Sequence, residues 1–202
     1  MKSMPYVEDS YENWLVLRLP PADWEPCFQD GAGAALAREV PGYALVAGYV
    51  HRFIKRGSVL DAGCGEATLA QYLDLGRLTY TGFDVSSTAI ARGCEDLSQG
   101  SAFVSSIEDF KADQEFDAIV FKGSLPSLDD PLGAVDRYRS YLAPDGVIII
   151  ALYVNTNDHG NSSLLARYLT AACAEGRYEL IERADTTSVT YQMSWRIFVL
   201  KR

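Results

Sequence analysis

The sequence is poor in the residues that most often bind metal ions. Its 202 residues include only two histidines and four cysteines. The cysteines stand alone, with neither a CxxC pair nor a histidine at metal-ligand spacing beside them. We therefore expect no metal site, and we expect buried thiols in a reducing cytoplasm. The four positions are Cys27, Cys64, Cys94 and Cys173.

Positive charge is also scarce. Eighteen Lys and Arg residues stand against 27 Asp and Glu residues, which leaves a formal net charge of -9. An acidic surface repels phosphate backbones, and no cluster of Lys and Arg indicates a local basic groove. Nucleic acid is therefore not an expected partner.

Long apolar runs are missing as well. No stretch approaches 18 apolar residues, and the opening segment MKSMPYVEDSYENW has no long apolar core. Neither secretion nor a membrane span is expected, so we predict a cytoplasmic protein without a membrane partner. A hydrophobic fraction of 48% and a charged fraction of 22% are typical of a soluble globular domain.

The chain does contain a regular alternation of apolar strands and amphipathic helices. Residues 1–41 hold breakers such as PPADWEP and little periodicity, which indicates an N-terminal arm or cap before a single domain at residues 42–202. Apolar residues from Tyr43 to Ile54 follow helical spacing. Beyond them the pattern predicts strands at 58–62, 78–85, 101–106, 116–123 and 146–154, and helices at about 66–75, 86–97, 130–142 and 162–174.

This alternation predicts an α/β fold with a mostly parallel sheet. Apolar strands such as VIIIALYV are typical of a sheet that helices cover on both faces. Two late apolar runs, 178–186 and 194–201, are joined by a turn-like stretch and predict an antiparallel hairpin at the sheet edge.

A glycine turn follows the first strand. The segment Val59-Leu60-Asp61-Ala62-Gly63-Cys64-Gly65 runs from an apolar strand into the turn, and a helix is predicted directly after it. Glycines allow a ligand to approach the backbone closely, and a helix N-terminus offers free N–H groups. Asp84 stands at the end of the next strand, where a carboxylate can accept hydrogen bonds from ribose hydroxyls. The third glycine of the dinucleotide pattern GxGxxG is missing, which makes NAD or FAD a poor fit.

The segment VLDAGCGEATLA resembles the first motif of the class I, Rossmann-like methyltransferases that depend on S-adenosylmethionine, and TGFDVSSTAI is similar to their second. This family has a three-layer αβα sandwich whose seven-stranded, mostly parallel sheet ends in an antiparallel hairpin. The resemblance implies that Gly63, Cys64 and Gly65, next to Ala62, line the methionine part of S-adenosylmethionine. It also implies that Asp84 binds the ribose, Val85 faces the adenine, and Asp61 orders the turn or a water near the cofactor's amino group.

Two further stretches carry the resemblance. The segment SSIEDF is similar to the third motif, which implies that Ser106 and Ile107 hold the adenine edge. Many members have Asp at the position of Ser106, so here a hydroxyl or a backbone carbonyl would meet the adenine amino group. The segment FDAIVFKGSLPSL is similar to the fourth motif, whose strand end passes beside the methionine and which contains Lys122. These motifs leave the methyl acceptor open.

Methyl transfer from a sulfonium depends chiefly on positioning, so a dedicated base is optional. His159 follows the strand that ends near residue 154 and is our candidate base, with a solvated loop residue as the alternative. His51 is read as a half-exposed helix residue. Aromatic residues of the N-terminal arm, Tyr11 and Trp14, are candidate substrate contacts, although they are equally typical of a cover for the sheet.

The sequence thus predicts a metal-independent methyltransferase that uses S-adenosyl-L-methionine, leaves S-adenosyl-L-homocysteine as product, and acts on a small organic molecule. Lys122 stands where a metal-dependent enzyme would need a carboxylate. One alternative is a member that binds the cofactor without transferring a methyl group, as a regulator or as an enzyme of another reaction. A second is a methyltransferase of protein or RNA. Monomer and homodimer both remain open.

Overall fold

The structure is a computed structural model, and it describes Glu25 and residues 42–154, 160–188 and 193–202. Tyr11, Trp14 and His159 lie outside these residues, as does almost all of the predicted arm at 1–41. Within the described ranges, no helix combines the length and the apolar character that a membrane span needs.

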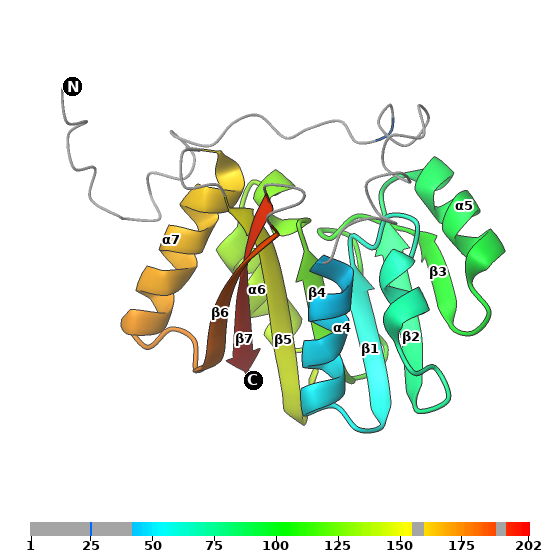
Figure 1. Cartoon of the computed structure of the whole chain (residues 1–202), viewed down its shortest axis with the longest axis horizontal. Coiled ribbons are helices and arrows are strands. Elements are labelled where there is room, and N and C mark those ends of the chain that lie inside the picture. The colour runs from blue at the N-terminus through cyan, green and yellow to red at the C-terminus, as the bar shows by residue number, and fades with distance from the viewer. Residues whose placement is uncertain (1–24, 26–41, 155–159, 189–192) are drawn as a thin grey trace.

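The core of the fold is one seven-stranded sheet in the order β3-β2-β1-β4-β5-β7-β6. Strands β1 to β5 run parallel to one another, and β7 pairs antiparallel with both β5 and β6 (Figure 1). The fold is therefore the Rossmann-like α/β sandwich with a C-terminal hairpin that the sequence predicts. The strands are β1 (Gly57–Ala62), β2 (Leu78–Asp84), β3 (Ser101–Val104), β4 (Phe116–Lys122), β5 (Leu142–Val154), β6 (Leu180–Ser188) and β7 (Met193–Lys201).

The hairpin departs in one detail from a simple addition to the edge. The last strand, β7, is inserted between β5 and β6, so it is β6 that forms the edge. Since β7 is buried from Trp195 to Leu200 except at Arg196, this apolar strand gains two neighbours, while the more polar β6 takes the exposed place.

Helices cover both faces of the sheet. One apolar core joins α6 and α7 to residues such as Leu60 and Phe121, and a second joins α4 and η2 to residues such as Val59 and Val120. Alternate residues of β1 and β4 thus point to opposite cores, as the pleat requires. The helices are α4 (Gly42–Phe53), the 3₁₀ turns η2 (Thr68–Tyr72) and η3 (Leu125–Ser127), α5 (Ser87–Asp96), α6 (Pro131–Arg139) and α7 (Asn161–Ala174).

Two helices begin at residues whose side chains cap them. The Ser86 hydroxyl accepts the Ala89 N–H at 3.0 Å at the start of α5. Asp130 accepts the Gly133 N–H at 2.9 Å at the start of α6, and Pro131 occupies the first turn. Polar N-cap residues satisfy backbone donors that a helix leaves free, which explains why both helices begin where predicted.

The helix predicted at 66–75 is wrong. Only the five-residue η2 forms there, and it starts late because Ala67 has a left-handed φ of 53° directly after Gly65, whose φ is 55°. A non-glycine residue rarely adopts that conformation, so no helical pattern in the sequence could reveal it. The glycine turn therefore presents its own backbone to the sheet edge, without the N-terminus of a long helix.

A second glycine lets α5 pack against this turn. A Cβ atom on Gly93 would lie 2.6 Å from the carbonyl carbon of Glu66 and 2.7 Å from its oxygen. Contacts that short do not occur between real atoms, so only glycine fits here. Gly93 thus sets how closely α5 approaches the turn.

Replacing Gly93 with Ala should therefore lower the free energy of unfolding by about 1–3 kcal/mol, the usual cost of overpacking. The matched control is Gly48→Ala in α4, where a Cβ would meet nothing within 4 Å. That change should raise the free energy of unfolding by about 0.5–1 kcal/mol, because alanine is the better helix former. Urea unfolding followed by far-UV circular dichroism measures both, and effects of the same sign would contradict the close contact.

Candidate functional site

The candidate site lies where the parallel strands end, at the upper edge of the sheet in Figure 1. From β1 the strand order runs one way to β2 and β3 and the other way to β4 and β5. The chain therefore leaves β1 and β4 in opposite directions, and ligands of open α/β sheets bind at such a switch point.

The glycine turn at the end of β1 has a rigid backbone. The N–H groups of Gly63 and Cys64 both donate to the carbonyl of Phe83 on β2, at 2.9 Å each. On the β4 side, the Ser124 hydroxyl donates to the carbonyl of Ala62 at 2.6 Å. Gly63 has a φ of +78°, and a Cβ there would lie 2.4 Å from the Cβ of Ser124. Only glycine allows this turn to pass so close to β4.

Asp84 ties the same turn to β2. One carboxylate oxygen accepts the Gly65 N–H at 2.9 Å, and the other accepts the Ser86 N–H at 2.9 Å. A carboxylate offers about four acceptor positions, so each oxygen can still accept one hydroxyl. Asp84 is 9% exposed, whereas the apolar Val85 beside it is 58% exposed. The end of β2 thus combines a shielded acceptor with an apolar surface.

The buried Asp61 and the half-buried Lys122 carry opposite charges on the α4 side of the sheet. Burial raises the pKa of Asp61 to about 7, while a hydrogen bond from the Tyr80 hydroxyl at 2.9 Å and the charge of Lys122 oppose the rise. Burial also lowers the pKa of Lys122 to about 8, against the attraction of Asp61. The Lys122 ammonium lies 3.7 Å from the ring centroid of Tyr43. The charge of Asp61 is thus stabilised by Lys122 and by the Tyr80 hydroxyl. The charge of Lys122 is stabilised by Asp61 and by the ring of Tyr43.

Sequence reasoning missed both tyrosines as parts of the site. Tyr80 reaches Asp61 only because the neighbouring position in the sheet is Gly82, where a Cβ would lie 2.7 Å from the Tyr80 hydroxyl. A glycine inside an apolar strand often marks such a close approach, so that signal was present. Tyr43, by contrast, occupies one of the helically spaced apolar positions of α4, so nothing in its spacing distinguishes it from a core residue.

Cys64 is buried within this cluster. Burial, followed by the charges of Asp61 and Asp84, raises the pKa of its thiol well above the ordinary value. A thiol that stays protonated is a weak nucleophile, so Cys64 serves as a small packed side chain of the turn.

The segment after β3 lies beside Asp84. The Ser105 N–H donates to the Asp84 carbonyl at 3.0 Å, and Val104 pairs with Asp84 in the sheet. Ser106 is half-buried and Ile107 is buried. The structure therefore brings the predicted cofactor residues to one edge of the sheet: Asp61, Ala62, Gly63, Cys64, Gly65, Asp84, Val85, Ser106, Ile107 and Lys122.

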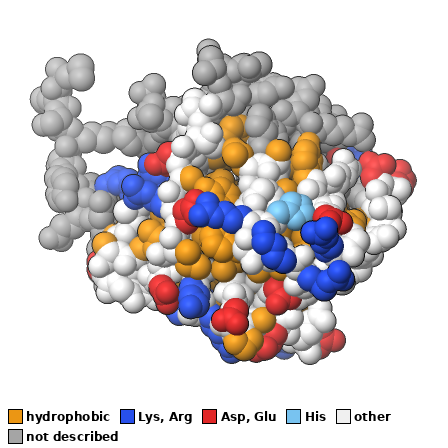
Figure 2. All heavy atoms as spheres, turned by 60° about the horizontal axis from the view of Figure 1, so that its bottom comes forward, with side chains coloured by type: hydrophobic (Ala, Val, Ile, Leu, Met, Phe, Trp, Pro, Cys, Tyr) orange, Lys and Arg blue, Asp and Glu red, His pale blue; other side chains and the backbone are white. Residues whose placement is uncertain are grey.

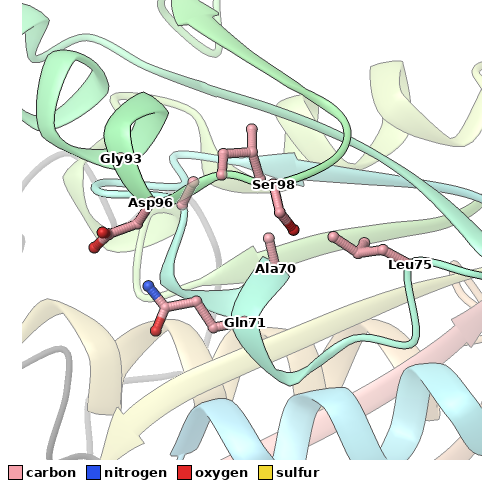
Figure 3. A pocket seen from close by; sticks show the side chains of 8 residues that line it. Ala70, Gln71, Leu75, Gly93, Asp96 and Ser98 are labelled. Atoms are coloured by element: carbon pink, nitrogen blue, oxygen red, sulfur yellow. The ribbon is translucent and has the colours of Figure 1, made fainter.

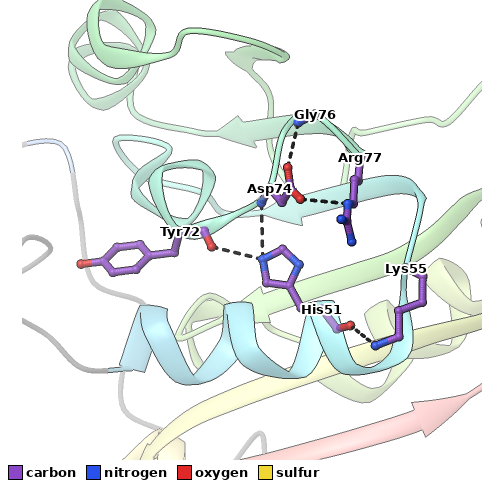
Figure 4. A network of polar contacts seen from close by, with 6 residues as sticks. All are labelled: His51, Lys55, Tyr72, Asp74, Gly76 and Arg77. Carbon is purple, nitrogen blue, oxygen red and sulfur yellow. Dashed lines mark hydrogen bonds and ion pairs between the residues drawn. The ribbon is translucent and has the colours of Figure 1, made fainter.

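His51 lies far from this edge, near the C-terminus of α4. Its Nε2 atom is 3.3 Å from the Tyr72 carbonyl oxygen and 3.4 Å from the Asp74 nitrogen, so the ring joins α4 to the loop before β2 (Figure 4). On the face of the molecule seen in Figure 2, Lys and Arg side chains are interspersed with Asp and Glu side chains. A shallow depression of about 370 Å³ beside His51 is lined by Ile54, Lys55 and Arg77. These contacts favour a structural role for His51.

A small surface hollow lies behind the glycine turn, between η2 and α5. Ala70, Gln71, Leu75, Gly93, Asp96 and Ser98 line it (Figure 3), and its volume is about 30 Å³. That volume has room for only a water molecule or two, so the hollow is not a substrate pocket. Among the described residues, no three His, Cys, Asp or Glu side chains are arranged to hold a metal ion.

The family follows from a comparison with known domains. A family model described as a methyltransferase domain matches residues 36–186. The chain belongs to this methyltransferase family. Its members use S-adenosylmethionine as the methyl donor.

One curated relative is the ubiquinone biosynthesis O-methyltransferase of Actinobacillus pleuropneumoniae serotype 5b (strain L20). It is 27% identical over an aligned length of 103 residues, and the match covers 46% of this chain and 44% of the relative. The match thus spans less than half the length of the curated relative.

Solved structures show the same fold at low sequence identity. The 1,6-didemethyltoxoflavin-N1-methyltransferase of Burkholderia thailandensis, solved with S-adenosylhomocysteine, has a TM-score of 0.67 and 17% identity over 100% of this chain and 93% of its own. The 4+2-cyclase SpnF has a TM-score of 0.60 and 15% identity over 79% of this chain and 80% of its own. At these identities the likeness establishes the fold alone.

The buried Asp61 predicts a pH-dependent stability. Its pKa in the folded state, about 7, lies above the ordinary value. The protonated Asp61 carboxyl therefore makes its full contribution to the free energy of unfolding below about pH 4. That contribution is lost as the pH rises through 7. In Asp61→Asn the amide oxygen still accepts the Tyr80 hydroxyl but does not titrate. Relative to this variant, the free energy of unfolding of the wild type should fall between about pH 4 and 7, by on the order of a few kcal/mol.

Urea unfolding at several pH values measures this difference. In the wild type Lys122 stays largely protonated across the window, since its pKa is about 8 with the support of the Asp61 charge. If the free energy of unfolding changes with pH in the same way in the two proteins, the pKa of Asp61 is not raised in the folded state.

Proposed function

We propose that this chain is a methyltransferase that uses S-adenosyl-L-methionine to methylate a small organic molecule without a metal ion. The observation that carries the proposal is the pair of shielded carboxylates, Asp61 and Asp84, on either side of the glycine turn at the switch point. This arrangement suits a nucleoside joined to an amino acid. We place the protein in the cytoplasm, as a monomer or homodimer.

The residues at the edge fit S-adenosylmethionine group by group. Asp84 keeps acceptor positions for the two ribose hydroxyls, and the exposed Val85 supplies an apolar surface for the adenine face. Gly63 and Gly65 have φ of +78° and +55°, and these left-handed conformations bring the backbone of the turn to this edge, where we place the methionine part. Asp61 and Lys122 carry the two opposite charges that an amino-acid head group requires.

When bound, S-adenosylmethionine supplies a methyl group on a positively charged sulfur. The chain's own part is to hold this cation and to orient the acceptor. With Asp61 ionised, two carboxylates and one ammonium leave one negative charge in excess at the edge. That excess favours the cationic donor over the neutral S-adenosylhomocysteine.

For the methyl acceptor we propose a chemical class, a small organic molecule. The Burkholderia thailandensis relative is named for methylating 1,6-didemethyltoxoflavin, and that supports a small organic acceptor. Tyr11 and Trp14 stay our candidates for acceptor contacts and His159 for a base, although all three lie outside the described residues.

A second candidate function is cofactor binding without methyl transfer. It is favoured by the likeness to the 4+2-cyclase SpnF, a protein of this fold named for another reaction. A screen of small phenols, amines and carboxylates, run with labelled S-adenosylmethionine and EDTA, separates the two. A labelled product supports metal-independent transfer, whereas cofactor binding with no product from any acceptor favours the alternative. A methyltransferase of protein or RNA would instead label a macromolecule.

Asp84→Asn should weaken the binding of S-adenosylhomocysteine by about 1.5–3 kcal/mol, the usual cost of losing charge-assisted hydrogen bonds. Asparagine keeps the shape of the side chain but only one acceptor oxygen, so the change removes one of the two backbone bonds of Asp84 as well as a ribose contact. Isothermal calorimetry measures the affinity, and thermal unfolding checks that the turn is intact. The control is Asp145→Asn, an exposed carboxylate in the first part of β5. Equal affinity of wild type and Asp84→Asn would reject the ribose assignment.

His159→Ala should lower turnover at least about tenfold with the acceptor found in the screen, because general-base help is typically worth about 10²–10⁴-fold. The affinity for S-adenosylhomocysteine should stay nearly constant. If the variant keeps full turnover over the whole pH range, His159 is not the base, and positioning alone supports the reaction.

A further inference from the structure

Tyr80 is a buried residue of β2 whose side chain lies in the core on the α4 side of the sheet. Its backbone pairs with Val59 of β1, but its hydroxyl reaches further along that strand and donates to a carboxylate oxygen of Asp61 at 2.9 Å. Asp61 is itself 2% exposed. The two side chains therefore form a hydrogen bond in the interior, directly before the glycine turn.

Two glycines make room for the Tyr80 side chain. At Gly82 a Cβ would lie 2.7 Å from the Tyr80 hydroxyl oxygen and 2.9 Å from the Cys64 sulfur. At Gly100, which precedes β3 and has a φ of +100°, a Cβ would lie 2.6 Å from the Tyr80 carbonyl oxygen. Contacts that short do not occur between real atoms, so a larger residue at either position would displace the tyrosine or its neighbours. The surrounding backbone thus fixes where the hydroxyl lies.

Within the described residues, Tyr80 is the one hydrogen-bond donor assigned to the Asp61 carboxylate. Lys122 acts on Asp61 through its charge, and no direct hydrogen bond between the two is assigned in those ranges. A buried carboxylate that loses its donor keeps the cost of desolvation without the compensating bond, and it then binds a proton more readily. The ionised state of Asp61 therefore depends on Tyr80.

The Tyr80 hydroxyl remains a donor throughout the neutral pH range. Burial, and then the charge of Asp61, raises the pKa of Tyr80 well above its ordinary value, so the hydroxyl keeps its proton. Besides Tyr80, only Lys122 favours the ionised form of Asp61, while the charge of Asp84 opposes it. The other titratable side chains that face Asp61 come from the described elements around it: Tyr43 of α4, Cys64 of the turn, Asp84 of β2 and Lys122 of β4.

We propose that Tyr80 is a positioning residue for the cofactor, because its hydroxyl holds the Asp61 carboxylate in place and ionised to attract the amino group of the methionine part, directly or through a water. This inference rests on the proposed function, since it requires that S-adenosylmethionine binds at this edge. An ammonium group is bound more strongly by an ionised carboxylate than by a neutral carboxyl. Tyr80 is 0% exposed, so it acts through Asp61 and does not touch the ligand.

The test follows the affinity for S-adenosylhomocysteine between about pH 5 and pH 8 by isothermal calorimetry. In the wild type the affinity should fall as the pH drops through about 7, where Asp61 takes up a proton. In Tyr80→Phe the carboxyl lacks its donor, so the fall should occur about one pH unit higher, the extra strength of a hydrogen bond to a charged group. At pH 7 the ionised fraction drops from about a half to about a tenth, so the variant should bind about fivefold more weakly. At about pH 5 the two affinities should converge.

The matched control is Tyr178→Phe. The Tyr178 hydroxyl is also buried, but it donates to the Leu132 carbonyl at 3.1 Å in the core on the other face of the sheet. This change removes an equal hydroxyl and should leave the pH dependence of binding unchanged. A second measurement needs no ligand. The loss of stability in Tyr80→Phe, followed by urea unfolding, should grow between about pH 5 and pH 8, because the variant lacks the bond that favours the ionised carboxyl.

A Tyr80→Phe binding profile with the same midpoint as the wild type would overturn the proposal. An equal shift of the midpoint in Tyr178→Phe, or a loss of stability in Tyr80→Phe that does not change with pH, would overturn it as well. In each of these cases cofactor binding itself stands. If S-adenosylhomocysteine fails to bind the wild type at any pH, the proposed function falls, and this inference falls with it.

Discussion

The Asp84 carboxylate is the interaction on which the rest of the site depends. Its two oxygens accept one N–H from the glycine turn after β1 and one from the start of α5. A single side chain at the end of β2 therefore fixes the relative positions of three elements that are distant in the sequence. Because hydrogen bonds to a charged group are among the stronger ones, the edge stays ordered without help from a long helix after the turn.

The close approach of backbones adds to this constraint. Gly63 lets the turn pass beside β4, and Gly93 lets α5 pass beside the turn. In both places a single methyl group would collide with neighbouring atoms. Close packing holds the carboxylate, the turn and the apolar Val85 at one edge of the sheet, with the small hollow between η2 and α5 behind the turn.

Electrostatics completes the edge. Asp61 is buried, and burial alone would keep it neutral at pH 7; the Tyr80 hydroxyl and Lys122 bring its pKa back to about 7. Lys122 loses solvation in the same place and is held by Asp61 and the ring of Tyr43. A pair poised in this way can adjust its protonation to the charge of a ligand, which suits a site that alternates between a cationic donor and a neutral product.

Local patterns in the sequence determined most of the fold and indicated where the candidate site lies. The alternation of strands and helices, the caps at Ser86 and Asp130, and the position of Asp84 at a strand end all depend on neighbours a few residues away, so spacing reveals them. Tertiary structure alone decided that β7 inserts before β6, that Ala67 takes a left-handed conformation and stops the expected helix, and that Tyr138 reaches the Ile107 carbonyl from 31 residues away. Those outcomes depend on contacts between distant segments, which a local pattern does not encode.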